Sequence, residues 1–275
     1  MTDLAAKEWR FIVEQSAPGP LQMAFDETAA ETVADGGPRT VRVYRWEPST
    51  LSLGYRQEAK TVDWEYCEAE GVTVTRRQTG GGGIYHDSFG DISYSIVVPA
   101  DEVPGDLLSC YELLCKPLLE FFDRLGLAAD FAESEQPSIY EPACYLRGIH
   151  PAHDILCNGR KISGNAQYRT RDAVVQHGSI SVRTRPERHL AVFKEHNLSH
   201  EVFTKRVTGI MEETDQQLDR ETIVSTLERT LADWVDASSG DWTDSERSRA
   251  ETIAAEKYAT NSWVKDRERN TAAEQ

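Results

Sequence analysis

Four consecutive glycines, Gly80 to Gly83, are the feature that most restricts how this chain can fold. Glycine loses more conformational freedom on folding than any other residue, so a simple turn rarely uses four in a row. The run follows an alternating segment at 72–75 and leads to another at 92–98, and both patterns are typical of β-strands. It therefore predicts a connection between strands that another group approaches closely. The run does not end in Gly-Lys-Ser/Thr, as a Walker loop would, and it does not lead into a helix, as the glycine motif of a dinucleotide-binding fold would.

The glycine run has two cationic neighbours. Unsubstituted backbone at Gly80, Gly81, Gly82 and Gly83 could direct N–H groups at a phosphate, while Arg76 or Arg77 supplies a fixed positive charge. The alternative interpretation is a flexible hairpin with incidental arginines.

The rest of the sequence predicts an α+β fold. Further strands are expected at 9–13, 41–46, 50–55, 154–157 and 174–182, with 50–55 as the partner of 41–46. Helices are expected at 21–33, 64–69, 107–125, 186–195, 219–236 and 244–258, the last two capped by Asp219 and Asp244. Residues 130–153 are irregular and are typical of an active-site loop. We expect a single domain over 1–275, with a helical C-terminal extension at about 201–275.

Composition narrows the choice of partners. Thirty Lys and Arg stand against 46 Asp and Glu, a net charge of -16 that is spread along the chain, which argues against a nucleic-acid partner. A dense acidic surface with few lysines is typical of a halophilic protein, although a merely acidic one would look similar. The five cysteines show no metal or disulfide spacing, and no apolar run is long enough for a membrane span. We expect a cytoplasmic protein.

Two side chains are candidates for chemistry. Lys161 stands between two glycines, and its ammonium could stabilise negative charge that develops on an acyl oxygen; alternatively, Asn158-Gly159 predicts a surface turn there. His86 precedes Asp87 and could be an oriented imidazole, although neighbours on a strand point apart.

Two segments resemble the signatures of the lipoate-protein ligase A / lipoyl-octanoyl transferase family. One is RRQTGGGGIYHDSFGDISY at 76–94, and the other is NGRKISGNAQYR at 158–169 with VQHGSI at 175–180. The likeness covers about residues 8–200. It implies a mixed β-sheet flanked by helices, a fold shared with biotin-protein ligases.

The resemblance also implies a reaction. Ligases of this family join lipoate or octanoate to ATP, with Mg²⁺, as an acyl-adenylate, and a lysine of a carrier domain then attacks the acyl carbonyl. Arg77 would contact the nucleotide phosphates, and Lys161 would hold the adenylate phosphate and the acyl oxygen. The acyl and nucleotide site would be lined by Gly82, Gly83, Ile84, Tyr85, His86, Gly164 and Ala166.

The implied partner is an apo lipoyl carrier domain, either of a 2-oxoacid dehydrogenase E2 or the glycine cleavage H protein. The roughly seventy-five residues beyond position 200 are too few for the accessory domain of such ligases. A separate accessory subunit is therefore expected.

A sister branch, the cysteine-dependent octanoyltransferases, carries an acyl-thioester nucleophile shortly before the lysine signature, where this chain has Cys144. The alternative for Cys144 is a small buried hydrophobic residue. The donor would then be an octanoyl acyl carrier protein, without ATP. The full glycine run and Tyr85-His86-Asp87 favour the ligase, which we predict. A non-catalytic protein that binds lipoyl domains or a ligase, and a biotin ligase, are the remaining alternatives.

Overall fold

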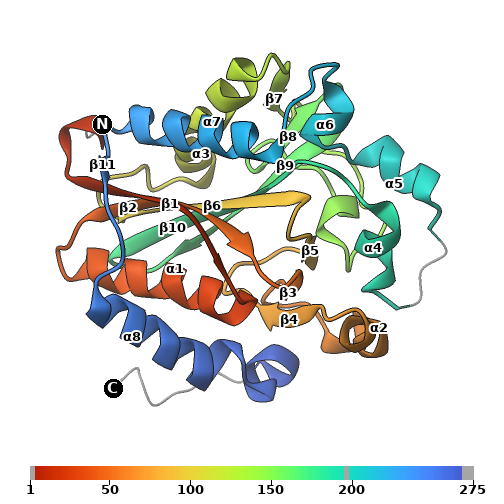
Figure 1. Ribbon diagram of the computed structural model, residues 1–275, viewed down its shortest axis with the longest axis horizontal. Helices are drawn as coiled ribbons and strands as arrows, with labels where there is room; N and C mark the ends of the chain where they lie inside the picture. The colour runs from red at the N-terminus through yellow and green to blue at the C-terminus, as the bar shows by residue number, and fades with distance from the viewer. Residues whose placement is uncertain (1–3, 195–197, 268–275) are drawn as a thin grey trace.

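The computed structural model describes residues 4–194 and 198–267, which form two β-sheets flanked by helices (Figure 1). The larger sheet contains, in spatial order, β11 (Ser238–Ser239), β1 (Trp9–Ala17), β2 (Arg39–Trp46), β6 (Asp91–Pro99), β10 (Ala173–Ser181), β9 (Arg160–Arg169), β8 (Asp154–Cys157) and β7 (Ala129–Phe131). β1 runs parallel to β2 and β11, and the other neighbours are antiparallel. The smaller sheet has the order β4 (Thr73–Arg76), β3 (Thr50–Leu53) and β5 (Ile84–His86).

Helices cover both faces of the larger sheet. α1 (Gly19–Ala34) and α8 (Asp244–Ile253) lie on one face, and α3 (Leu107–Arg124) and α7 (Arg220–Trp234) lie on the other (Figure 1). The shorter helices are α2 (Trp64–Ala69), α4 (Pro186–Ala191), α5 (His200–Arg206) and α6 (Ile210–Glu213). Tight 3₁₀ turns occur at Leu4–Ala6, Ala59–Thr61 and Cys144–Leu146, and π-helical turns at Ala254–Tyr258 and Ser262–Asp266.

This architecture confirms the predicted mixed sheet flanked by helices. Each face of the larger sheet has its own apolar core, and a third core lies between the smaller sheet and α2, α4 and α5. Phe121 and Phe122 of α3 are fully buried, and truncating a residue of this kind to alanine costs about 3–5 kcal/mol. The core therefore holds the strands that carry the site in a fixed register.

The helix predictions at 21–33, 64–69, 107–125 and 219–236 are confirmed, and the Asp219 side chain caps α7 by accepting from the Thr222 N–H. The predicted cap at Asp244 is wrong by one residue. Thr243 is the N-cap of α8, because it forms a reciprocal capping box with Glu246. The helix expected at 186–195 ends at Ala191, and residue 195 lies outside the described residues.

The predicted pairing of 50–55 with 41–46 is wrong. Both edges of β2 are occupied, by β1 and β6, so β3 pairs with β4 and β5 instead. No strand was predicted between residues 157 and 174, yet residues 160–169 form the strand β9, and α5 and α6 were not predicted. Within 4–194 and 198–267, no helix combines the length and apolarity that a bilayer span requires.

Candidate active site

A cavity of about 650 Å³ opens between the two sheets, a size within the usual range for small-molecule sites. Its walls come from β2, β6, β9 and β10, from the glycine segment and from the irregular stretch at 135–150. Nine of the predicted site residues line it: Arg77, Gly80, Gly81, Ile84, His86, Cys144, Lys161, Gly164 and Ala166. The other four, Arg76, Gly82, Gly83 and Tyr85, are not among its lining residues.

Lys161 is presented by a tight hairpin. Asn158 and Gly159 have φ values of 49° and 75°, the left-handed pair of a type I′ turn, so the predicted turn is present. The turn brings β9 back along β8, and Lys161 is only 5% exposed. Its Nζ lies 2.6 Å from Oδ1 of Asp154 on β8. The ammonium is therefore a buried group with a fixed counter-ion, and not a surface lysine.

Gly164 makes room for this ion pair. A Cβ at this position would lie 2.9 Å from Cε and 3.1 Å from Nζ of Lys161. Any side chain here would displace the lysine from the carboxylate. Gly164 therefore lines the cavity and leaves the space that Lys161 occupies.

Asp154 completes the charged pair and was missed by the sequence reasoning. Its side chain is fully buried, and Oδ2 accepts the backbone N–H of His150 at 2.8 Å and lies 3.2 Å from Nδ1 of His153. Burial alone would raise the pKa of Asp154, but the Lys161 ammonium and His153 hold the pKa well below its usual range. Burial would lower the pKa of Lys161, but the charge of Asp154 outweighs the effect of burial, so the pKa of Lys161 is raised. Both groups are therefore ionised at neutral pH.

Cys144 faces the ammonium from the irregular stretch. It begins the 3₁₀ turn Cys144–Leu146, and its Sγ lies 3.9 Å from Nζ of Lys161. Lys161 also donates to the Cys144 carbonyl oxygen at 3.4 Å. Cys144 is half-buried, whereas the other four cysteines are buried. The structure thus brings the two candidate catalytic residues together in one cavity.

The glycine run is approached closely by the segment that carries Cys144. The Gly83 N–H donates to the Pro142 carbonyl at 2.7 Å, and the Cys144 N–H donates to the Gly83 carbonyl at 2.8 Å. A Cβ on Gly82 would lie 2.8 Å from the Cys144 nitrogen. The prediction of a close approach was right, but the approaching group is the protein's own backbone.

The predicted phosphate contacts of Arg76 and Arg77 need correction. Arg76 is fully buried outside the cavity, where it donates to carbonyl oxygens at 54–57 and in the last π turn. Arg77 donates to Ser52, Thr79, Gly80 and Gly82 with its three nitrogens, so its N–H groups are all engaged. Arg76 therefore does not face the cavity, whereas Arg77 lines it with its N–H groups bonded to oxygens of the protein.

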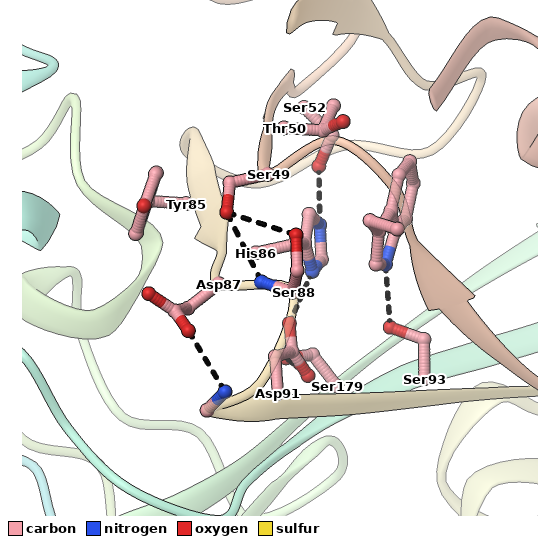
Figure 2. Close-up of polar contacts among 12 residues, drawn as sticks. Ser49, Thr50, Ser52, Tyr85, His86, Asp87, Ser88, Asp91, Ser93 and Ser179 are labelled. Carbon is pink, nitrogen blue, oxygen red and sulfur yellow. Dashed lines mark hydrogen bonds and ion pairs between the residues drawn. The ribbon is translucent and has the colours of Figure 1, made fainter. Parts of the chain in front are cut away.

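His86 is an oriented imidazole, but its carboxylate partner is Asp91 and not Asp87. Figure 2 shows the ring between Ser52 and Asp91, with Nε2 2.8 Å from Ser52 Oγ and Nδ1 bonded to the Asp91 carboxylate. Asp87 instead accepts the backbone N–H groups of residues 89 and 90. Tyr85 points to the opposite face of β5, where its ring packs against His189, so the predicted lining role of Tyr85 is also corrected.

A fold and a site of this kind define a class of acyl-transferring enzymes, and the chain belongs to the lipoyl protein ligase A/B catalytic domain family, which it matches over residues 18–232. It is 32% identical to octanoyltransferase LipM of Geobacillus kaustophilus over 94% of this chain and 99% of that protein. It is 31% identical to octanoyltransferase LipM of Anoxybacillus flavithermus over 93% and 97% of the two chains.

Solved structures agree on the family. The crystal structure of a lipoate-protein ligase A bound with ATP superposes with a TM-score of 0.78 at 26% identity, covering 94% of this chain and 98% of that one. The bipartite lipoate protein ligase of Thermoplasma acidophilum, at 23% identity and a TM-score of 0.79 over 97% and 100% of the chains, supports the fold.

These relatives correct the predicted function. The curated proteins that match nearly the whole chain are named octanoyltransferases, which overturns the ATP-dependent lipoate-protein ligase and agrees with the alternative. In the described part of the chain, no group of three or more His, Cys, Asp or Glu side chains is arranged to hold a metal ion.

Proposed function

We propose that the protein is a cysteine-dependent octanoyltransferase. It moves an octanoyl group from an acyl carrier protein to Cys144, and from Cys144 to a lysine of an apo lipoyl carrier domain. The observation that carries the proposal is the 3.9 Å separation between Cys144 Sγ and the buried Lys161 ammonium, inside a cavity that suits an acyl chain. The names of the full-length relatives support it.

In the first step the Cys144 thiolate attacks the thioester carbonyl of the donor. A carbon–sulfur bond forms, negative charge develops on the carbonyl oxygen, and the carrier's thiolate leaves and takes up a proton. The Lys161 ammonium stabilises the attacking sulfur and then the developing oxyanion, and such stabilisation is strongest in a site that excludes water. Asp154 keeps that ammonium charged and aimed at the sulfur.

In the second step the neutral amine of the acceptor lysine attacks the acyl-Cys144 carbonyl. An amide bond forms, the Cys144 sulfur leaves, and the amine proton passes to it or to solvent. A thioester is a more reactive acyl donor than an amide, so the exchange proceeds without ATP. No adenylation step occurs, and the accessory subunit expected of a ligase is not needed.

The acceptor is the lysine of an apo lipoyl domain, as in a 2-oxoacid dehydrogenase E2 or a glycine cleavage H protein. Its side chain must reach the cavity from outside, and Cys144 is the site cysteine that is not fully buried. A lysine stem extended from the tip of a carrier domain fits this geometry. The proposal therefore includes a protein acceptor, and not a free amine.

The test is to incubate the purified protein with octanoyl acyl carrier protein, without ATP, and to weigh the intact protein. The wild type should gain one octanoyl group, and apo lipoyl domain added afterwards should remove it and gain the same mass. Cys144→Ser should form no acyl-enzyme, and Lys161→Ala should acylate at least 100-fold more slowly, about the effect of removing one oxyanion donor.

Cys67→Ser is the matched control. Cys67 is buried in the third core, and burial raises the pKa of its thiol to about 12, so it should not react. The variant should transfer octanoyl at the wild-type rate. Modification of the lipoyl domain that requires ATP and persists in Cys144→Ser would refute the proposal.

A further inference from the structure

We propose that two buried carboxylate–imidazole–hydroxyl relays, which meet at Arg77, form a positioning frame for Cys144. The inference rests on the proposed function, because it concerns the nucleophile of that reaction. His86 and His177 are positioning residues in this frame and do not touch the substrate's reacting atoms. Both imidazoles belong to polar sets that the two transfer steps leave unexplained.

The first relay runs from Asp91 through His86 to Ser52. The Asp91 carboxylate accepts the His86 Nδ1–H, and burial, the largest influence, lowers the pKa of His86 despite that carboxylate. A neutral ring with its proton on Nδ1 has a lone pair on Nε2, which accepts the Ser52 hydroxyl at 2.8 Å. The Ser52 oxygen then accepts from Arg77 Nη1 at 2.8 Å. Stacking on Trp46, with ring centroids 4.1 Å apart, fixes the plane of the imidazole.

The second relay approaches Arg77 from the other side. Arg42 forms a buried ion pair with Asp26 at 2.7 Å, and Asp26 Oδ2 lies 3.1 Å from Nδ1 of His177. His177 Nε2 lies 2.9 Å from the Thr79 hydroxyl, which accepts from Arg77 Nε at 3.2 Å. The order of groups repeats that of the first relay: carboxylate, imidazole, hydroxyl, guanidinium.

Arg77 connects both relays to the glycine segment. Its Nη2 donates to the carbonyl oxygens of Gly80 and Gly82, at 3.1 Å and 3.0 Å. The next carbonyl, that of Gly83, accepts the backbone N–H of Cys144. Five hydrogen bonds fix the guanidinium. Gly83, next in the chain to Gly82, connects it to Cys144 through the backbone hydrogen bond. A shift of Arg77 must therefore move the segment that holds Cys144 against Lys161.

The first relay has the composition of a hydrolytic triad, but its geometry excludes that role. Ser52 is 0% exposed and is not among the residues that line the cavity. Its oxygen is also occupied by the Arg77 donor, so it has no path to an acyl carbonyl. A serine nucleophile must meet its substrate, and this one faces a guanidinium instead. The relay consequently acts on the arginine.

A double-mutant cycle tests the frame. His86→Phe keeps an aromatic ring on Trp46 but removes both nitrogens, and Arg77→Met removes the junction. Two rates are measured for each variant and for the double variant: alkylation of Cys144 by iodoacetamide, which needs no acyl donor, and single-turnover acylation by saturating octanoyl carrier protein. A misplaced nucleophile can slow a reaction by about 100-fold, so His86→Phe should slow both rates by roughly 10- to 100-fold. In the Arg77→Met background it should cause no further loss.

Ile223→Val on α7 is the control for general destabilisation, since Ile223 is buried in the core between the larger sheet and the helices α3 and α7. It should lower the melting temperature and leave both rates unchanged. Ser52→Ala, which removes a single hydroxyl, repeats the cycle if His86→Phe does not fold. The frame is refuted if the two losses multiply, if His86→Phe reacts like the wild type, or if Ile223→Val is equally slow. A wild type that alkylates but never acylates would refute the proposed function alone.

Discussion

Removal of the Asp154 carboxylate should make catalysis slow and, unlike that of the wild type, prone to fail in alkali. Asp154→Asn keeps the shape of the side chain but leaves the Lys161 ammonium, 5% exposed, without a counter-ion. At 2.6 Å the attraction is worth about 6 kcal/mol at an effective dielectric constant of about 20. Desolvation offsets part of it, and breaking a buried pair usually costs about 3–5 kcal/mol of stability. A loss of about 3–5 kcal/mol is a large share of a domain's free energy of unfolding, but the variant should still fold.

The catalytic effect follows from the same pair. Burial lowers the pKa of Lys161 once the Asp154 charge that opposes it is gone. The lysine then becomes neutral as the pH rises through that lowered pKa, and a neutral amine stabilises neither a thiolate nor an oxyanion. We expect acylation of Cys144 in Asp154→Asn to be slower by about 100-fold at neutral pH and to fall further in alkali.

The assay is single-turnover octanoyl transfer, read by intact mass between pH 6 and pH 9, with unfolding curves recorded in the same buffers and in acid buffers below about pH 4. Asp130→Asn, an exposed carboxylate on β7, is the matched control and should behave as wild type. The folded-state pKa of Asp154 is lowered, so its stabilisation is present above about pH 4, the unfolded pKa, and disappears as the pH falls through the folded pKa. The two stability curves should therefore converge in acid. An Asp154→Asn protein with the wild-type rate and pH profile would falsify the role of the ion pair.

Two further predictions concern packing and stability. Gly82→Ala should slow the alkylation of Cys144 at least 10-fold, since a Cβ would lie 2.8 Å from the Cys144 nitrogen. A Cβ in Gly80→Ala meets nothing within 4 Å, so this control should react normally, and equal rates for the two variants would contradict the close packing. Glu246→Gln should cost on the order of 2 kcal/mol at pH 7, because Glu246 accepts both Arg10 terminal nitrogens between β1 and α8. Burial opposes ionisation there, but hydrogen bonds and the charge of Arg10 lower the pKa of Glu246 to about 2. The difference in denaturant midpoints between the variant and the wild type should therefore vanish as the pH falls from 4.5 to 2. A difference that does not depend on pH would argue against the ion pair as its cause.

Local signals in the sequence were sufficient for several parts of the site. The Asn158-Gly159 pair predicts a type I′ turn with positive φ at both residues, which is what the hairpin has. The rarity of lysine drew attention to Lys161, and the amphipathic pattern at 107–125 gave α3. Each of these features depends on residues within a few positions of one another.

The pairing of strands that lie far apart in the sequence could not be predicted from such local signals. The partner of β3 depends on the fact that β1 and β6 already occupy both edges of β2, and no property of residues 50–55 reveals it. The Asn158-Gly159 turn predicts a hairpin, in which Leu156 pairs with Lys161. Asp154 pairs with Gly164 after a register shift between Ile155 and Leu156, and the turn does not reveal that shift.

The functions of the arginines were also set by distant partners. Arg77 resembled a phosphate ligand because it precedes four glycines, yet its acceptors include Ser52, which lies on another strand. The acceptors of Arg76 include carbonyls almost 190 positions away. A guanidinium has five donors, and the sequence does not show which acceptors the fold will bring to them.

The two groups that we propose for the chemistry come from parts of the fold that tolerate change to different degrees. Lys161 lies on β9, which has a neighbouring strand on each side, whereas Cys144 lies on an irregular stretch between β7 and β8. Insertions and replacements are absorbed far more easily in such a stretch than in a central strand. A thiol can thus be gained or lost by rewriting a loop while the buried cation stays in place. The same scaffold carries proteins named octanoyltransferase and lipoate-protein ligase.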